Sequence, residues 1–298
     1  MASPLLECVP NVSEGRDLGA VGAVGGAVRG VPGVTLADVH ADPDHHRSVF
    51  TFLGAPQAVE EAALALAAAV FARVDMREHR GMHPRLGALD VMPFVPLRDL
   101  AMADAVGIAR RVGRAIAAVH TLPVYFYGAA ATRAERKTVG EIRRGEYEGL
   151  AERLNTPAGW PDAGPAVFVP RRGGAMVGAR DILVAYNVWL DSRDLGAARD
   201  VARAVRESSG GLPAVQALGL PLERRGLVQV SMNLLDHRRT GIAGAYDAVA
   251  EQAARRGITI KRAELVGLAP RAAFEGRAPE TVGLSDLADT KYLDAYLA

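Results

Sequence analysis

Residues 34–54 have the sequence VTLADVHADPDHHRSVFTFLG, in which two apolar stretches flank a polar loop. The two stretches, 34–40 and 48–54, are rich in β-branched and aromatic residues and alternate as strands do. Two strands joined by one short polar loop predict an antiparallel hairpin. Helical patterns flank this hairpin at 16–30 and 56–74, so we place it at the centre of the first half of the chain.

The whole first half follows the order strand, helix, two strands, helix, strand. Its outer strands are LLECVP at 5–10 and ALDVMPFVPL at 88–97. The second half repeats this order, with strands at 181–190, 214–223, 227–236 and 258–270 and helices at 193–207 and 240–256. Because βαββαβ is the ferredoxin-like order, we predict an α+β fold of two ferredoxin-like subdomains with a ligand cleft between them. Each has one antiparallel sheet with helices on one face, and the domains are 1–179 and 180–298.

Further elements extend the first half. The pattern predicts a helix at 101–119, a strand at 123–128 and a helix at 132–154. Residues 155–180 are crowded with Pro and Gly and keep no period, which predicts a long loop. A loop of this length inside a compact chain is often functional.

Composition narrows the class of protein. The chain has 35 basic and 34 acidic residues, which does not favour a nucleic-acid binder that depends on bulk charge. The longest apolar run, at 62–72, is too short to span a bilayer. A single cysteine, Cys8, and an N-terminus without a signal pattern favour a reducing compartment. We therefore expect a cytoplasmic protein that binds neither nucleic acid nor membrane.

The stretch REHRGMHPRLGALDV, residues 77–91, carries two histidines four positions apart. Gly81 and Pro84 interrupt any helix through His79 and His83, so this spacing does not indicate a helical metal site. A histidine held in a rigid bend beside Arg85 suits proton transfer on an anionic substrate, since its ordinary pKa is about 6.5.

A metal-dependent amidohydrolase is the alternative. The candidate ligands are the histidines and aspartates of two loops, namely His40, Asp42, Asp44, His45, His46, His79 and His83. The sequence contains no HExxH, HxH or CxxC spacing, which weakens this interpretation. The phosphate-binding motif GxxxxGK[ST] and the GxSxG nucleophile motif are also absent.

Other polar residues are candidates for binding. Asn11 lies at a strand end, and Gln229 and Asn233 alternate along one face of a strand that faces either solvent or a ligand. Arginines near the Gly-rich stretch RRGGAMVGAR can meet carboxylates, and these are Arg171, Arg172 and Arg180.

Eight motifs, in order along nearly the whole chain, resemble the glutamate formimidoyltransferase family, whose transferase domain is fused to a cyclodeaminase in animals. They are ECVPNVSEGRD, SVFTFLG, HPRLGALDVMPFVPL, PVYFYG, RRGEYEGL, VGARDILVAYNVWL, VQVSMNLLD and ELVGLAP. The resemblance implies transfer of a formimino group from N-formimino-L-glutamate to N5 of tetrahydrofolate, in histidine breakdown, by a homodimer without a metal.

The resemblance also implies which residues act. Its catalytic histidine corresponds to His83. Its folate-binding stretch corresponds to Gly164, Pro165, Ala166, Val167, Phe168, Val169, Pro170, Arg171, Arg172 and Gly173. The group that orients the histidine is left open among His40, Asp42 and His79, and Arg85 and Arg180 are candidates to hold substrate carboxylates. A folate-binding module without activity remains a further alternative.

Overall fold

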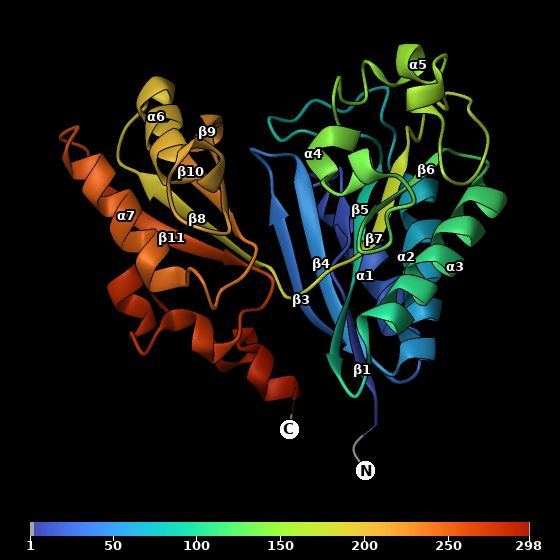
Figure 1. Cartoon of the computed structure of the whole chain (residues 1–298), viewed down its shortest axis with the longest axis horizontal. Coiled ribbons are helices and arrows are strands. Elements are labelled where there is room, and N and C mark those ends of the chain that lie inside the picture. The colour runs from blue at the N-terminus through green and yellow to red at the C-terminus, as the bar shows by residue number, and fades with distance from the viewer. Residues whose placement is uncertain (1–2, 298) are drawn as a thin grey trace. The chain divides into compact units, whose positions relative to one another are not determined.

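The computed structural model describes residues 3–297 and forms two compact units, Met1–Arg180 and Asp181–Ala298, here called unit 1 and unit 2. Each unit has its own β-sheet with helices on one face, so the predicted α+β class is confirmed. In Figure 1, unit 1 runs from blue to yellow-green and unit 2 from yellow to red.

Unit 1 contains a seven-stranded sheet. Its strands are β1 (Leu5–Cys8), β2 (Asn11–Val12), β3 (Val34–Asp42), β4 (Arg47–Gly54), β5 (Leu89–Arg98), β6 (Val124–Gly128) and β7 (Ala175–Ala179). β1 and β2 act as one interrupted strand, because both pair antiparallel with β4 and β5. The predicted hairpin is confirmed by the antiparallel pairing of β3 with β4. The order β3, β4, β1/β2, β5 is the ferredoxin-like order.

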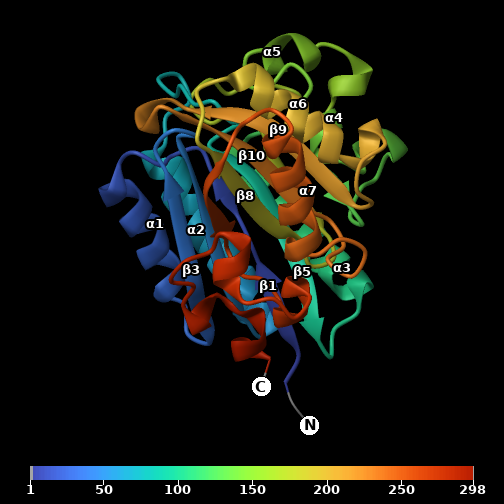
Figure 2. The ribbon, with the colours of Figure 1, turned by 90° about the vertical axis from the view of Figure 1, so that its left-hand side faces the viewer.

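Three long helices cover one face of this sheet. They are α1 (Leu18–Arg29), α2 (Pro56–Arg73) and α3 (Met102–His120). The core between helices and sheet includes the fully buried Phe50, Phe52 and Leu66. Figure 2 shows α1 beside α2 against the blue strands, an arrangement that their contacts support. Burial of these large apolar side chains is the main force that fixes the helices on the sheet.

One antiparallel sheet was predicted for this half, and that prediction is wrong at one edge. β7 pairs parallel with β5, and β6 pairs parallel with β7. α3 crosses over from β5 to β6, and such a crossover returns the next strand in the same direction. β7 then inserts between β5 and β6, from a segment that was predicted to be loop throughout.

The predicted helix at 132–154 is also wrong. Only short pieces are helical there, α4 (Val139–Ile142), α5 (Leu150–Arg153) and a 3₁₀ turn at Ala134–Arg136. The chain turns sharply between α4 and α5, where Gly145 and Glu146 have φ of 80° and 54°. A left-handed conformation cannot continue an α-helix, so the helical pattern of residues 132–154 is overridden at this turn.

Unit 2 matches the predicted βαββαβ order. Its strands are β8 (Val184–Leu190), β9 (Val215–Leu222), β10 (Leu227–Leu234) and β11 (Ile260–Val266), and its helices are α6 (Leu195–Val205) and α7 (Ile242–Ala254). The sheet is antiparallel in the order β11, β8, β10, β9. Figure 1 shows α6 and α7 on one face of this sheet.

Strand β10 shows the alternation that the sequence predicts. Val228 and Val230 are buried in the core beneath the helices, while Gln229 and Asn233 project from the opposite face. No helix among residues 3–297 is both long and apolar enough to cross a membrane.

Candidate active site

The stretch between α2 and β5, residues 74–88, is called the histidine loop here. Backbone contacts hold it from both sides: the amide of Met76 donates to the carbonyl of Arg171 at 3.0 Å. Gly81 lies against the β3–β4 loop, where a Cβ atom would be 2.4 Å from the carbonyl oxygen of His45. Only glycine allows this close approach, so the sequence itself fixes where the loop passes.

His83 lies in the histidine loop and is partly buried. Its Nδ1 is 2.8 Å from the carbonyl oxygen of Pro84. Because a carbonyl only accepts hydrogen bonds, Nδ1 carries the proton, and Nε2 of the neutral ring has the free lone pair. Nε2 is therefore the atom that can take a proton from a substrate.

The surroundings of His83 favour this neutral form. Burial lowers the pKa of His83 well below its usual value, and the nearby cations Arg47 and Arg143 lower it further, with a smaller effect from His45. The ring centroids of His45 and His83 are 5.8 Å apart. At neutral pH, His83 is consequently a base that is ready to accept a proton.

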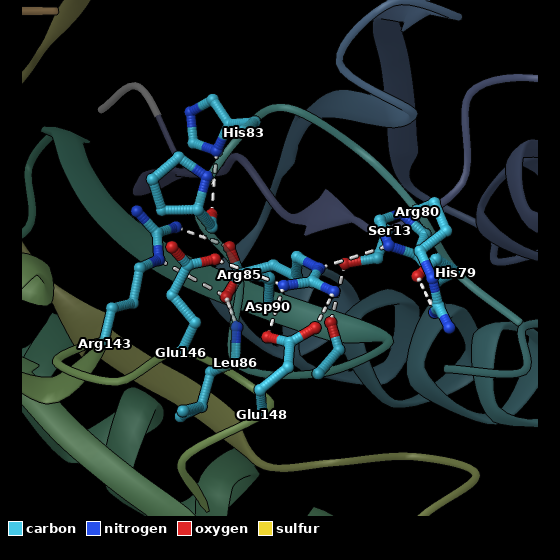
Figure 3. Close-up of polar contacts among 12 residues, drawn as sticks. Ser13, His79, Arg80, His83, Arg85, Leu86, Asp90, Arg143, Glu146 and Glu148 are labelled. Carbon is cyan, nitrogen blue, oxygen red and sulfur yellow. Dashed lines mark hydrogen bonds and ion pairs between the residues drawn. The ribbon is translucent and has the colours of Figure 1, made fainter. Parts of the chain in front are cut away.

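Two of these cations belong to a buried set of three charged residues, Arg47, Asp90 and Arg143, called the Asp90 cluster here. The Asp90 carboxylate is fully buried and accepts from Arg47 Nη1 at 2.7 Å and from Arg143 Nη2 at 2.5 Å. It also accepts from the backbone amide of Leu86 at 2.8 Å. Figure 3 shows the contacts of Arg143 and Leu86 converging on Asp90. The cluster thus ties β4, β5 and the segment after α4 to the end of the histidine loop.

The Asp90 cluster carries one uncompensated positive charge. Burial would raise the pKa of Asp90, but Arg143 and Arg47 outweigh it and lower that pKa, so Asp90 is ionised. Burial lowers the pKa of Arg47 only to about 10, which leaves it charged at neutrality. Two guanidiniums and one carboxylate then leave a single positive charge beside His83.

The segment Gly164–Gly173 ends against the histidine loop. Gly87 and Gly173 form an antiparallel bridge, and the amide of Ala88 donates to the carbonyl of Arg172 at 2.8 Å. A Cβ atom on Gly87 would lie 2.2 Å from the carbonyl oxygen of Gly174. The two stretches that the sequence singled out are therefore in direct backbone contact.

Tyr147 connects the same two stretches through its side chain. Its hydroxyl donates to the carbonyl of Pro170 at 2.6 Å, and its ring lies 5.3 Å from that of Phe168. Its backbone amide donates to the carbonyl of Arg85 at 2.9 Å. The start of the 164–173 segment is more open, with Val167 58% exposed, so this part of the segment is accessible to a ligand.

Comparison with known families and proteins identifies the family of this chain. Residues 5–180 match the formiminotransferase domain, N-terminal subdomain, and residues 185–279 match the formiminotransferase domain. The chain belongs to the formiminotransferase domain family. It is 42% identical over 91% of its length to glutamate formimidoyltransferase of Thermoplasma acidophilum, covering 89% of that protein.

Two further relatives agree. Glutamate formimidoyltransferase of Streptococcus pyogenes is 37% identical over 91% of this chain and 90% of its own length. Formimidoyltransferase-cyclodeaminase of Rattus norvegicus is 42% identical over 90% of this chain, which spans 50% of that longer protein. The predicted resemblance to this family is thereby confirmed.

Within this formiminotransferase domain, two of the predicted supporting residues are engaged with protein groups. His79 Nε2 donates to the carbonyl of His46 at 2.9 Å, and His79 Nδ1 accepts from Arg85 Nε at 3.2 Å. Burial lowers the pKa of His79 to about 4, so it is neutral. Arg85 also binds Glu148 through Nη1 at 2.8 Å and Nη2 at 2.6 Å. These contacts favour a structural role for both residues.

The other predicted arginines also have protein partners. Arg171 donates to the carbonyl of Ala72, and Arg172 donates to the carbonyl of His120 at the end of α3. Arg180 lies close enough to Glu7 to lower the pKa of that buried carboxyl, which burial raises to about 7. These protein partners favour a structural role for the three arginines.

The remaining predicted residues are spread over both units. Asn11 Oδ1 accepts from Arg47 at 2.9 and 3.1 Å, so Asn11 supports the Asp90 cluster. Asp42 Oδ1 accepts from the backbone amides of Asp44 and His45. His40 pairs with Val49 in the β3–β4 hairpin. Gln229 and Asn233 belong to β10 of unit 2.

These contacts do not favour the metal-dependent alternative. Both ring nitrogens of His79 and one oxygen of Asp42 already bind protein groups. A metal ligand needs a free lone pair, and these hydrogen bonds leave none on the ring of His79.

Sequence reasoning missed three residues of the site, Asp90, Arg143 and Tyr147. Asp90 stands in GALDV and the other two in RRGEYEGL, both of which are family motifs. Their charge and aromatic character were the available signal. A single helix over 132–154 would put Arg143 and Tyr147 on one helix face, and it predicts no contact of either residue with Asp90, which lies in a predicted strand.

Proposed function

We propose that this chain is a glutamate formimidoyltransferase, which moves the formimino group of N-formimino-L-glutamate to N5 of tetrahydrofolate. Its membership of the formiminotransferase family and the curated names of full-length relatives support this activity. The observation that carries the mechanism is the hydrogen bond from His83 Nδ1 to Pro84, which leaves Nε2 as a base in the loop whose backbone contacts the 164–173 segment.

The reaction requires one proton to move from the acceptor to the leaving group. N5 of tetrahydrofolate attacks the amidine carbon of the donor and forms a tetrahedral intermediate. His83 Nε2 takes the proton that N5 gives up and delivers it to the glutamate nitrogen, whose bond to carbon then breaks. Glutamate leaves, the formimino group stays on N5, and His83 returns to its neutral form.

The amidine of the donor carries its own positive charge, so its carbon is electrophilic and we propose a reaction without a metal. The residues Gly164–Gly173 are proposed to bind tetrahydrofolate as co-substrate. Their backbone contact with the histidine loop would hold the pterin amine near Nε2, and such positioning supplies much of the rate enhancement in a two-substrate reaction.

We also propose that the protein acts in the cytoplasm as a homodimer and in histidine degradation. The single cysteine supports a reducing compartment. The family resemblance supports the dimer and the pathway. Neither nucleic acid nor membrane is needed for this reaction.

The test mixes protein, N-formimino-L-glutamate and tetrahydrofolate and follows 5-formiminotetrahydrofolate by absorbance. The wild-type protein should turn over, and His83→Ala should lose about 100- to 10,000-fold in kcat, the usual contribution of a general acid–base group. Added imidazole should restore part of the activity of His83→Ala, which a merely structural histidine would not allow.

A matched control is His120→Ala, since His120 lies at the end of α3 with its ring on Phe71. This variant should keep wild-type turnover. An inactive wild-type protein would reject the proposed function. A fully active His83→Ala would reject the mechanism and leave the function standing.

A further inference from the structure

The three nitrogens of Arg47 are used by the protein, whereas one nitrogen of Arg143 is not. Arg47 donates Nη1 to Asp90 and its other two nitrogens to Asn11. Arg143 donates Nε and Nη2 to Asp90. Within residues 3–297, Arg143 Nη1 has no hydrogen-bond acceptor.

Arg143 is also reachable. Its side chain is 13% exposed, while the Asp90 carboxylate that holds it is fully buried. Asp90 accepts two hydrogen bonds from one edge of the guanidinium and fixes its plane. Binding of a ligand to Nη1 therefore costs less side-chain entropy than binding to a mobile arginine. A guanidinium held in this way is preorganised to bind an anion.

The charge around Arg143 points to the same conclusion. The Asp90 cluster has one uncompensated positive charge, and both of its cations are close enough to His83 to lower the pKa of that ring. A bound carboxylate would neutralise this charge. Among the residues that contact Asp90, none supplies a second negative charge.

The chemistry of the two substrates selects which carboxylate this is. In N-formimino-L-glutamate, the α-carboxylate sits on the carbon that bears the reacting nitrogen, so it lies next to the amidine. The carboxylates of tetrahydrofolate belong to the glutamate tail, at the far end of the molecule from N5. A carboxylate site beside the proton-transfer histidine therefore fits the donor's α-carboxylate.

We infer that Arg143 is a substrate-binding residue whose Nη1 holds the α-carboxylate of the formimino donor, with Asp90 as its positioning partner. This inference rests on the proposed function. It assigns recognition of the donor to the segment after α4. In that segment the helix ends, and Arg143 lies against Asp90.

The first test compares donors on the wild-type protein and needs no variant. N-formiminoglycine keeps the α-carboxylate, whereas 4-(formiminoamino)butyrate lacks it and keeps the distal one. Loss of the α-carboxylate should lower kcat/KM about 10- to 100-fold, the usual effect of a hydrogen bond to a charged group. Equal kcat/KM for N-formimino-L-glutamate and the butyrate donor would overturn the inference.

The second test replaces the residue. Arg143→Lys keeps a positive charge on Asp90 but has no second edge to offer. It should lower kcat/KM about 10- to 100-fold for N-formimino-L-glutamate, and leave kcat/KM for the butyrate donor within about threefold of wild type. Arg144→Gln, the exposed neighbour, is the matched control and should match wild type with each donor.

Equal losses with both donors, or a higher KM for tetrahydrofolate alone, would show that Arg143 does not hold the α-carboxylate. If the wild-type protein shows no turnover, the proposed function fails and calorimetry decides the inference separately. Binding of N-formimino-L-glutamate that is about 10- to 100-fold weaker in Arg143→Lys would support it. Unchanged binding, or no binding to wild type, would overturn it.

Discussion

Replacement of Asp90 by asparagine tests the energetics of the site most directly. The Asp90 carboxylate is fully buried and accepts from Arg47 at 2.7 Å, from Arg143 at 2.5 Å and from the amide of Leu86 at 2.8 Å. Asparagine keeps the shape but leaves the buried guanidinium of Arg47 and the mostly buried one of Arg143 without a counter-charge. Breaking a buried ion pair in this way costs about 3–5 kcal/mol, so we expect a loss of that size in the free energy of unfolding at pH 7.

The loss should depend on pH in a defined direction. The folded pKa of Asp90 lies below its ordinary value, because Arg143 and Arg47 outweigh the effect of burial. Its contribution is therefore complete above the unfolded pKa of about 4 and is lost as the pH falls below that value. The difference between wild type and Asp90→Asn should accordingly narrow at acid pH.

The assay is urea unfolding followed by tryptophan fluorescence. The chain has two tryptophans, Trp160 in unit 1 and Trp189 in unit 2. In a Trp189→Phe background, Trp160 reports on unit 1 alone, so unfolding of unit 2 does not enter the signal.

The matched control is Asp75→Asn in the same background. Asp75 binds Arg77 at 2.5 Å, but this pair is exposed to solvent and screened. We expect little change in the urea midpoint. The reasoning about burial would be refuted if Asp90→Asn cost no more than Asp75→Asn, or if its cost were within about 1 kcal/mol of zero, well below the range for a broken buried pair.

Three further outcomes are expected. The acid limb of the pH profile of kcat/KM should fall below the ordinary histidine pKa of about 6.5, because burial and the neighbouring guanidiniums lower the pKa of His83; a limb at or above 6.5 would contradict this. Tyr147→Phe removes the hydroxyl that donates to Pro170 and should raise the KM for tetrahydrofolate about fivefold, for a loss of about 1 kcal/mol, while the donor KM is unchanged. Gly87→Ala would place a Cβ atom 2.2 Å from the Gly174 carbonyl, so its melting temperature in a calorimeter should fall by several degrees, and an unchanged value would disprove the close approach.

Much of the fold could be predicted because its elements carry local signals. The 34–54 hairpin and strand β10 show their alternation in the sequence, and the structure confirms both. Residues 132–154 were predicted as one helix because their pattern is helical, whereas the positive φ at Gly145 and Glu146 ends the helix between α4 and α5. β7 was missed because Ala175–Ala179 is a short run of small and apolar residues that becomes a strand only between β5 and β6.

In the site, too, the residues with a local signal could be predicted and the long-range contacts could not. His83 could be chosen as the candidate base from its neighbours and from the family resemblance. The contacts of Arg47, Asp90 and Arg143 could not, because ion pairs between residues 43 and 53 positions apart depend on how three elements meet. Burial, which sets the pKa of each of these groups, is likewise a property of the folded chain.

The central place of β7 bears on how unit 1 is made on the ribosome. Ala175–Ala179 forms the strand between β5 and β6, and both of these are synthesised earlier. Among the described residues, β6 therefore has no β-strand partner until β7 has been synthesised. Because Gly164–Gly173 leads directly into β7, a nascent chain orders the proposed folate-binding segment in the same step that closes the sheet. Translation that stops short of residue 175 would thus leave a chain with an open sheet edge that is prone to aggregate.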